Sequence, residues 1–246
     1  MYLYSFSRFF GFDKICRMTD DSSEDVRWWK KSRKVKPGDL LVFGNEYFFA
    51  LGDKVVFSEQ YERKDVVKAE LVYKQFFTKS TLELLHWMVE NYYTTYKSVI
   101  RLFVANDIQK LLEREWKLKA WSSKLKAVSE WQTLIVFPDL WTMTNEDSKM
   151  EKWKDGKMEN EIVTLLSSDT EKQKDVHRWE IKKWMKSVIL CTYAEIFQDF
   201  HNLKKIIFVD PHKRYYANQQ DPRYKVGEVL AKLVELHWAE LETVGV

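Results

Sequence analysis

Apolar and polar positions in the first third of the chain follow the pattern of short strands joined by turns. Residues 35–57 read VKPGDLLVFGNEYFFALGDKVVF and are rich in β-branched and aromatic side chains. Pro-Gly, Gly-Asn and Gly-Asp pairs interrupt this stretch, and such pairs favour tight turns. The pattern predicts a small barrel or a curled sheet.

A helical period replaces the strand pattern from Ser80 onward. Leu82, Leu85 and Met88 recur with helical spacing, and Ser80 with Glu83 three residues later has the pattern of a capped helix start. We expect this helix to close a first domain. Residues 106–130, rich in Lys, Glu and Leu, predict one or two further helices.

Three continuous apolar runs in the second half predict a parallel sheet. TLIVF (133–137), SVILC (187–191) and KIIFV (205–209) do not alternate, which is typical of strands covered on both faces. Ligands bind at the carboxyl ends of such strands, so we expect the residues that follow each run to lie at one edge. The highly charged residues 144–175 predict a solvated helix or an insertion.

Composition places the chain among folded proteins. Its 246 residues are 45% hydrophobic, and 40 Lys and Arg against 37 Asp and Glu give a net charge of only +3, which favours no class of partner. No apolar run approaches the roughly 20 residues of a membrane span, and the first residues lack the pattern of a signal peptide. Two cysteines, Cys16 and Cys191, fit a reducing compartment. We expect a cytoplasmic protein.

Glycine is scarce and tryptophan abundant. The chain has 7 glycines and 11 tryptophans, whereas glycine usually makes up about 7% of a protein. One explanation is an aromatic-rich domain. The alternative is that the gene uses UGA for glycine and was translated as if UGA meant tryptophan.

The most distinctive run is residues 187–230, in which Cys191-Thr192-Tyr193-Ala194-Glu195-Ile196-Phe197 precedes the strand that ends in Val209-Asp210-Pro211-His212-Lys213. Upstream lie Val136-Phe137-Pro138-Asp139-Leu140-Trp141-Thr142 and the helix from Leu84, and Pro37-Gly38-Asp39 precedes Phe43-Gly44. In order and spacing, these segments resemble the primosomal replication-restart helicases, the primosomal protein N′ or PriA-type family.

The resemblance implies an α/β protein of two parts. Residues 1–105 would form a small β-rich DNA-binding domain that resembles the family's 3′-end-binding domain. Residues 106–246 would form a partial RecA-like, parallel-sheet ATPase lobe. The chain ends before the family's second ATPase lobe, so it corresponds to the front half of such a helicase. Trp131, Trp141 and Trp184 fall at or near positions where the family commonly has glycine.

ATP chemistry is where the sequence departs from the family. No Gly-x4-Gly-Lys-Ser/Thr loop exists, and the aligned residues 111–118 keep only Lys117 while adding two carboxylates. Asp210 keeps the magnesium-binding position, but Pro211 replaces the carboxylate that would orient water. We expect a degenerate lobe without its own ATPase activity, in which ATP and magnesium are possible but not certain cofactors.

The resemblance also implies a DNA interface. The 3′-end pocket would contain Phe12, Asp13, Gly38 and Lys64, the aromatic-rich loop that couples DNA to the ATPase would contain Tyr215, Tyr216, Arg223 and Tyr224, and Thr192 would also contact DNA. Apart from the resemblance, residues 28–36 place five cations, among them Lys30, Lys31 and Arg33, beside two tryptophans, a combination suited to phosphate contacts and base stacking. The structural alternatives are that the basic segment is a solvated loop and that the tyrosines only pack beside a sheet. The expected partners are DNA forks, 3′ ends, single strands and other replication proteins.

Two other functions stay open. The chain could be the front fragment of an active helicase that another chain completes. It could also be a metal-dependent nuclease, since Asp139 with Glu180 and Lys182 fits a loose Pro-Asp…Glu-x-Lys pattern in which two carboxylates hold magnesium. Four of the five histidines, His177, His201, His212 and His237, show no metal-ligand spacing with cysteines or carboxylates.

Overall fold

A computed structural model describes most of the chain. The described residues are 2–6, 14–18, 35–43, 46–52, 62–66, 70–104, 108, 110–113, 131–145, 161–213, 216–218 and 221–245. The chain divides into two compact units, Met1–Lys97 and Ser98–Val246. The described residues form a mixed α/β protein, as expected, with one mostly antiparallel and one parallel sheet.

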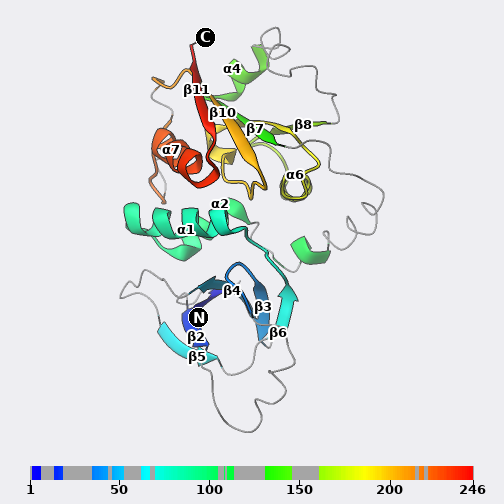
Figure 1. Cartoon of the computed structure of the whole chain (residues 1–246), viewed down its shortest axis with the longest axis vertical. Coiled ribbons are helices and arrows are strands. Elements are labelled where there is room, and N and C mark those ends of the chain that lie inside the picture. The colour runs from blue at the N-terminus through cyan, green and yellow to red at the C-terminus, as the bar shows by residue number, and fades with distance from the viewer. Residues whose placement is uncertain are drawn as a thin grey trace. The chain divides into compact units, whose positions relative to one another are not determined.

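The first unit contains a six-stranded sheet in the order β5-β2-β1-β4-β3-β6 (Figure 1). Every neighbouring pair is antiparallel except β2 and β5, which are parallel. The strands are β1 (Tyr2–Phe6), β2 (Lys14–Met18), β3 (Leu40–Phe43), β4 (Glu46–Gly52), β5 (Glu62–Val66) and β6 (Glu70–Tyr73). The described part of the turn-rich region 35–57 thus contains two antiparallel strands, β3 and β4.

The Pro-Gly-Asp turn before β3 is a structural junction. Gly38 has φ +91°, and a Cβ there would lie 2.3 Å from the carbonyl oxygen of Phe77, so only glycine fits. The Asp39 carboxylate accepts hydrogen bonds from the backbone N–H groups of Lys36 (2.8 Å) and Gln75 (2.9 Å). These bonds tie the start of the hairpin to the segment that leads into α1.

Helix α1 (Lys79–Asn91) buries the apolar positions that the sequence pattern predicted, including Leu82, Leu85 and Met88. Its N-cap is Thr78 and not Ser80, because Thr78 has extended backbone angles and its hydroxyl accepts the N–H of Thr81. Ser80 lies inside the first turn. The helix is followed by α2 (Tyr96–Phe103).

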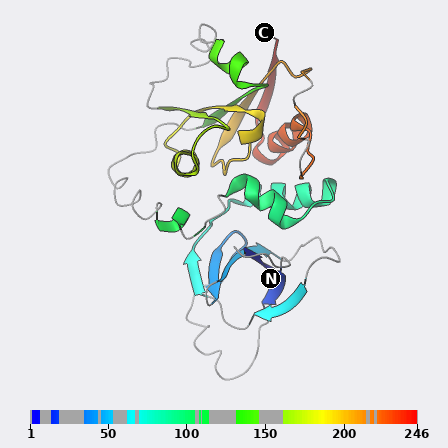
Figure 2. The same cartoon turned by 180° about the vertical axis from the view of Figure 1, so that it is seen from behind.

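The second unit is built around a five-stranded, fully parallel sheet in the order β11-β10-β7-β9-β8 (Figures 1 and 2). Its strands are β7 (Gln132–Phe137), β8 (Ile162–Leu165), β9 (Val188–Thr192), β10 (Leu203–Val209) and β11 (Glu240–Val244). The three predicted strands are therefore confirmed as β7, β9 and β10. Strands β8 and β11 were not predicted. Of the most polar stretch of the expected insertion, residues 144–161, residues 146–160 lie outside the described residues.

Both faces of this sheet are covered. Ile135, Leu190 and Ile207 share one face with Met143 of α4 (Leu140–Asn145). On the other face, Phe208 lies close to Gly227 of α7 (Val226–His237), the helix that packs on β10 and β11. Helix α6 (Glu171–Lys182) joins β8 to β9, and the 3-10 helix η3 (Tyr193–Glu195) follows β9. Two-sided burial explains why the strands are continuously apolar.

Candidate functional site

The carboxyl ends of β7, β9 and β10 meet at one edge of the parallel sheet. Phe137 at the end of β7 is opposite Thr192 at the end of β9, and Val136 is opposite Phe208 of β10. Asp139, Thr192 and Asp210 therefore lie at the same edge, as the parallel arrangement predicted. We call this the carboxyl edge and treat it as the candidate site.

Asp139 holds the start of helix α4. Its Oδ1 accepts the backbone N–H of Thr142 at 2.7 Å, and its carbonyl accepts that of Met143 at 3.2 Å. A carboxylate at this position satisfies amide groups that have no partner within the helix. The local geometry of Asp139 is that of a helix cap.

Asp210 is already paired with a cation from the same loop. Lys213 places its Nζ 3.1 Å from Asp210 Oδ2 and 3.5 Å from Thr142 Oγ1. Asp210 has φ +46°, and its N–H donates to the carbonyl of Val244 in β11 at 2.7 Å. Lys213 thus supplies positive charge where the resemblance implied magnesium, and Pro211 contributes no second carboxylate. This arrangement does not fit the magnesium site of an active lobe.

Tyr216 is part of the core beneath the carboxyl edge. Its hydroxyl donates to the carbonyl of Val209, and its ring packs on Phe208 with centroids 4.5 Å apart. Burial, then the negative charges of Asp210 and Asp139, raises the pKa of Tyr216 above its usual range. The hydroxyl therefore stays protonated and serves as a hydrogen-bond donor.

Two tyrosines of the expected aromatic-rich loop pack inward. Tyr216 and Tyr224 are 6% and 2% exposed, and the Tyr224 ring packs on Phe197 at 4.8 Å. Thr192 is also buried. A buried ring cannot stack on a base, so packing beside the sheet accounts for both tyrosines. Arg223 is exposed.

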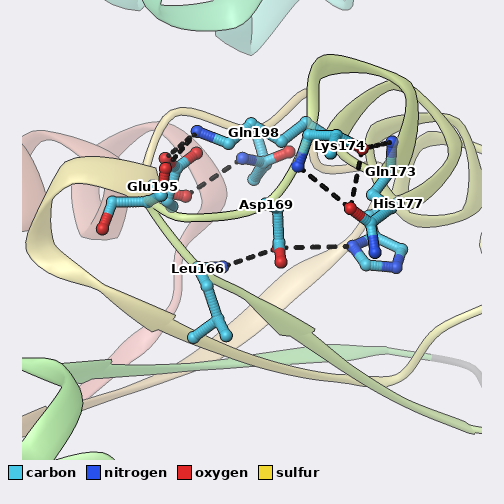
Figure 3. Close-up of polar contacts among 9 residues, drawn as sticks. Leu166, Asp169, Gln173, Lys174, His177, Glu195 and Gln198 are labelled. Atoms are coloured by element: carbon cyan, nitrogen blue, oxygen red, sulfur yellow. Dashed lines mark hydrogen bonds and ion pairs between the residues drawn. The ribbon is translucent and has the colours of Figure 1, made fainter.

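A buried ion pair lies beside the ends of β8 and β9 and was not predicted (Figure 3). Lys174 Nζ is 2.8 Å from Glu195 Oε1, with the two side chains 13% and 9% exposed. The same Nζ donates to the carbonyl of Ser167 at 3.3 Å, and Gln198 donates to the carbonyl of Glu195 at 3.0 Å. The pair links α6 to η3.

The loop before α6 positions Lys174. Asp169 accepts the N–H of Leu166 at 2.8 Å and lies 4.0 Å from Nδ1 of His177 (Figure 3). Thr170 and Gln173 then form a capping box that starts the helix. The Thr-x-x-Gln pattern at 170–173 was the one sequence signal for this region, because it marks a helix start.

The segment aligned with the phosphate loop is helical where it is described. Residues 110–113 are in helix, Leu111 and Leu112 are buried, and Glu113 is exposed. A phosphate-binding loop instead needs several backbone N–H groups that point to one centre. Lys117 lies outside the described residues.

The nuclease pattern is not assembled. Asp139 is at the carboxyl edge, whereas Glu180 and Lys182 are in the last turn of α6. That turn lies at the opposite edge, where Gln132, the first residue of β7, donates to the carbonyl of Ile181 at 2.8 Å. A five-residue strand separates the two edges, roughly 16 Å at about 3.3 Å per residue. The three residues therefore cannot share one metal ion.

Other predicted residues belong to the first unit or lie outside the description. Gly38 forms the turn before β3, and Lys64 is in β5, where its side chain is not described. The remaining predicted residues fall outside the described ranges: Phe12, Asp13, Lys30, Lys31, Arg33 and Tyr215. Within the described ranges, no three His, Cys, Asp or Glu side chains gather in a way that could hold a metal ion.

Comparisons with known proteins assign no family. Neither the models of known protein families nor the curated proteins contain a match to this chain. In the parts of the chain that the structure describes, no helix combines the length and apolar character needed to cross a membrane.

Proposed function

We propose that the chain binds DNA, at branched structures or single-stranded ends, through its first unit, and that its parallel-sheet unit does not hydrolyse ATP on its own. The arrangement of side chains at the carboxyl edge carries the claim that the chain does not hydrolyse ATP. At the carboxyl edge, Lys213 pairs with Asp210, Asp139 caps α4, and Pro211 stands beside Asp210.

Phosphoryl transfer to water depends on positioned charge. The enzyme must hold the phosphates, neutralise them with magnesium and orient a water molecule with a carboxylate or an amide. Here a helix occupies the described part of the aligned phosphate loop, and the Asp210 carboxylate has Lys213 as its cation. Pro211 stands at the position of the water-orienting carboxylate, and a proline side chain cannot accept a proton. These features support loss of hydrolysis at more than one step.

The proposal that the chain binds DNA is supported by the resemblance to the helicase family and by a cluster of positive charges in the first unit. Residues 28–36 read WWKKSRKVK and place five cations close together, a pattern suited to phosphate contacts. The first unit has the β-rich character expected of a domain that resembles the family's 3′-end-binding domain. A protein that grips DNA without hydrolysing ATP would serve as an adaptor for other replication proteins.

The experiment compares fork DNA carrying a 3′ hydroxyl with the same fork blocked by a 3′ phosphate, using fluorescence anisotropy. We expect tighter binding of the hydroxyl fork, and we expect Asp13→Asn or Lys64→Ala to erase the preference. Equal affinity for the two forks in the unaltered chain would refute recognition of the 3′ end.

A charge-removal variant tests the basic segment separately. Replacing Lys30, Lys31 and Arg33 with alanine should weaken binding to every DNA and lower the salt-dependence slope by about 2 to 3, since each phosphate contact contributes about 0.7 to 0.9. The matched control removes three cations from the second unit, by Lys172→Ala, Lys183→Ala and Lys225→Ala. An unchanged slope in the first variant, or an equal fall in the control, would contradict the assignment.

A further inference from the structure

Helices α6 and α7 end with similar backbone hydrogen bonds, and both ends include a bond from an N–H to the carbonyl five residues earlier. After α6, the N–H of Trp184 donates to the carbonyl of Ile181 (3.1 Å), and the N–H of Met185 donates to that of Glu180 (2.9 Å). After α7, the N–H groups of Trp238 and Ala239 both donate to the carbonyl of Val234. Bonds that close a helix in this way are typical of the Schellman and left-handed C-caps.

Tryptophan occupies the left-handed position of both caps. Trp184 has φ +63° and Trp238 has φ +53°. Helices usually place glycine at this position, because a Cβ in the left-handed region crowds the backbone. A bulky aromatic residue is poorly suited to it.

Exposure gives no compensating reason for the indole of Trp238. This side chain is 88% exposed at the end of α7, so it gains little from packing. Trp184 packs its ring on His201 at 4.4 Å, which makes Trp238 the cleaner case. Two other tryptophans, Trp131 and Trp141, are also exposed, at 47% and 73%.

The two remaining described tryptophans lie in helices and pack their rings. Trp179 is 3% exposed inside α6, and Trp87 is half-buried with its ring 5.5 Å from that of Tyr92. Of the six described tryptophans, Trp87 and Trp179 pack and have ordinary helical backbone, and Trp131 and Trp141 are exposed. Trp238 is both exposed and left-handed, and Trp184 is left-handed although its ring packs on His201. A large apolar ring is normally retained because it is buried.

Left-handed backbone alone does not identify a glycine position, since Gln75, Tyr93 and Asp210 also adopt it. The composition supplies an independent observation. The 7 glycines and 11 tryptophans depart from usual usage in opposite directions, and glycine normally reaches about 7%. A gene in which UGA means glycine, translated as if UGA meant tryptophan, produces both departures at once.

We infer that positions 184 and 238 are glycine in the protein as its own organism makes it, and that UGA is read as glycine at these codons and at codons 131 and 141. Trp87 and Trp179 are true tryptophans. This inference does not depend on the proposed DNA binding. Glycine would then occupy the left-handed position at the C-caps of both α6 and α7.

Peptide mass mapping of the protein isolated from its own organism is the direct test. We expect peptides that contain positions 131, 141, 184 and 238 to have the mass of glycine, and those with positions 87 and 179 to have the mass of tryptophan. The gene should carry UGA at the first four codons and UGG at the other two. Tryptophan at 184 or 238, or UGG at either codon, would overturn the inference.

The physical basis is tested on the purified chain as written. Trp238→Gly should raise the melting temperature by roughly 2–4 °C, because glycine relieves the left-handed strain. Trp238→Ala is the matched control: it removes the same ring but keeps a Cβ, so it should give less than half of that gain. Trp179→Gly should lower the melting temperature. An alanine variant as stable as the glycine variant would contradict the backbone argument.

Discussion

Removing Lys174 tests whether the buried ion pair holds the carboxyl edge together. Its Nζ lies 2.8 Å from Glu195 Oε1 and also donates to the carbonyl of Ser167. Lys174→Met keeps the length of the side chain but leaves Glu195, 9% exposed, without this partner. Stranding a buried charge costs about 3 to 5 kcal/mol. Because both side chains retain some exposure, we expect about 3 kcal/mol.

Two companion variants separate the interaction free energy of the pair from the effect of losing each side chain alone. Glu195→Leu alone should cost about 2 to 3 kcal/mol, since a partly exposed ammonium can move toward water. The double variant Lys174→Met with Glu195→Leu should lose less than the sum, because replacing a whole buried pair by apolar groups is often nearly neutral. We expect a coupling free energy of about 2 kcal/mol or more.

Urea unfolding, followed by circular dichroism and tryptophan fluorescence, measures these free energies. The exposed pair Lys225–Glu228, at 3.1 Å with side chains 72% and 43% exposed, provides the control. Its coupling should stay below about 0.5 kcal/mol. A coupling for Lys174 and Glu195 as small as that of the control would refute the structural role of the buried pair.

Three further predictions concern single side chains. Cys191 is buried, and burial with the nearby charge of Glu195 raises its thiol pKa well above the usual value, so alkylation by iodoacetamide at neutral pH should be slow until urea unfolds the chain. Burial lowers the pKa of His237 from 6.5 to about 4, so the unfolded state binds more protons between these values. The free energy of unfolding should therefore fall as pH drops from 6.5 toward 4, by about 1 to 3 kcal/mol, and His237→Gln should flatten this dependence. An equally steep dependence in the variant would show that groups other than His237 cause it. Thr78→Ala should cost about 1 kcal/mol by thermal unfolding and Ser80→Ala much less, because Thr78 caps α1; the reverse order would contradict the cap.

The sequence was sufficient to predict the three central strands of the parallel sheet but not its two outer strands. Continuous apolar runs predicted β7, β9 and β10, because strands covered on both faces have no polar alternation. Strand β8 is only four residues long, and β11 is largely exposed, so neither has such a run. Parallel connection then brought Asp139, Thr192 and Asp210 together without any further information.

Side-chain contacts at the edge could not be predicted from sequence. Lys174 and Glu195 are 21 residues apart and meet only because β8 and β9 are neighbours. The side chains of Tyr216 and Tyr224 suit a DNA-contacting loop and a core equally well, and only their burial decides between the two. Thr78 and Ser80 are both good caps by type, and only backbone conformation selects Thr78.

DNA-stimulated phosphate release is the most direct test of the central claim, that the chain binds DNA without hydrolysing ATP. Purified chain, ATP, magnesium and fork DNA are combined at a DNA concentration that saturates binding, and Pro211→Glu is measured in parallel. We predict bound fork DNA with no phosphate release above background in either protein, because one carboxylate does not rebuild the site around Asp210 and Lys213. Phosphate release that rises with fork DNA and disappears in Asp210→Ala would contradict the account.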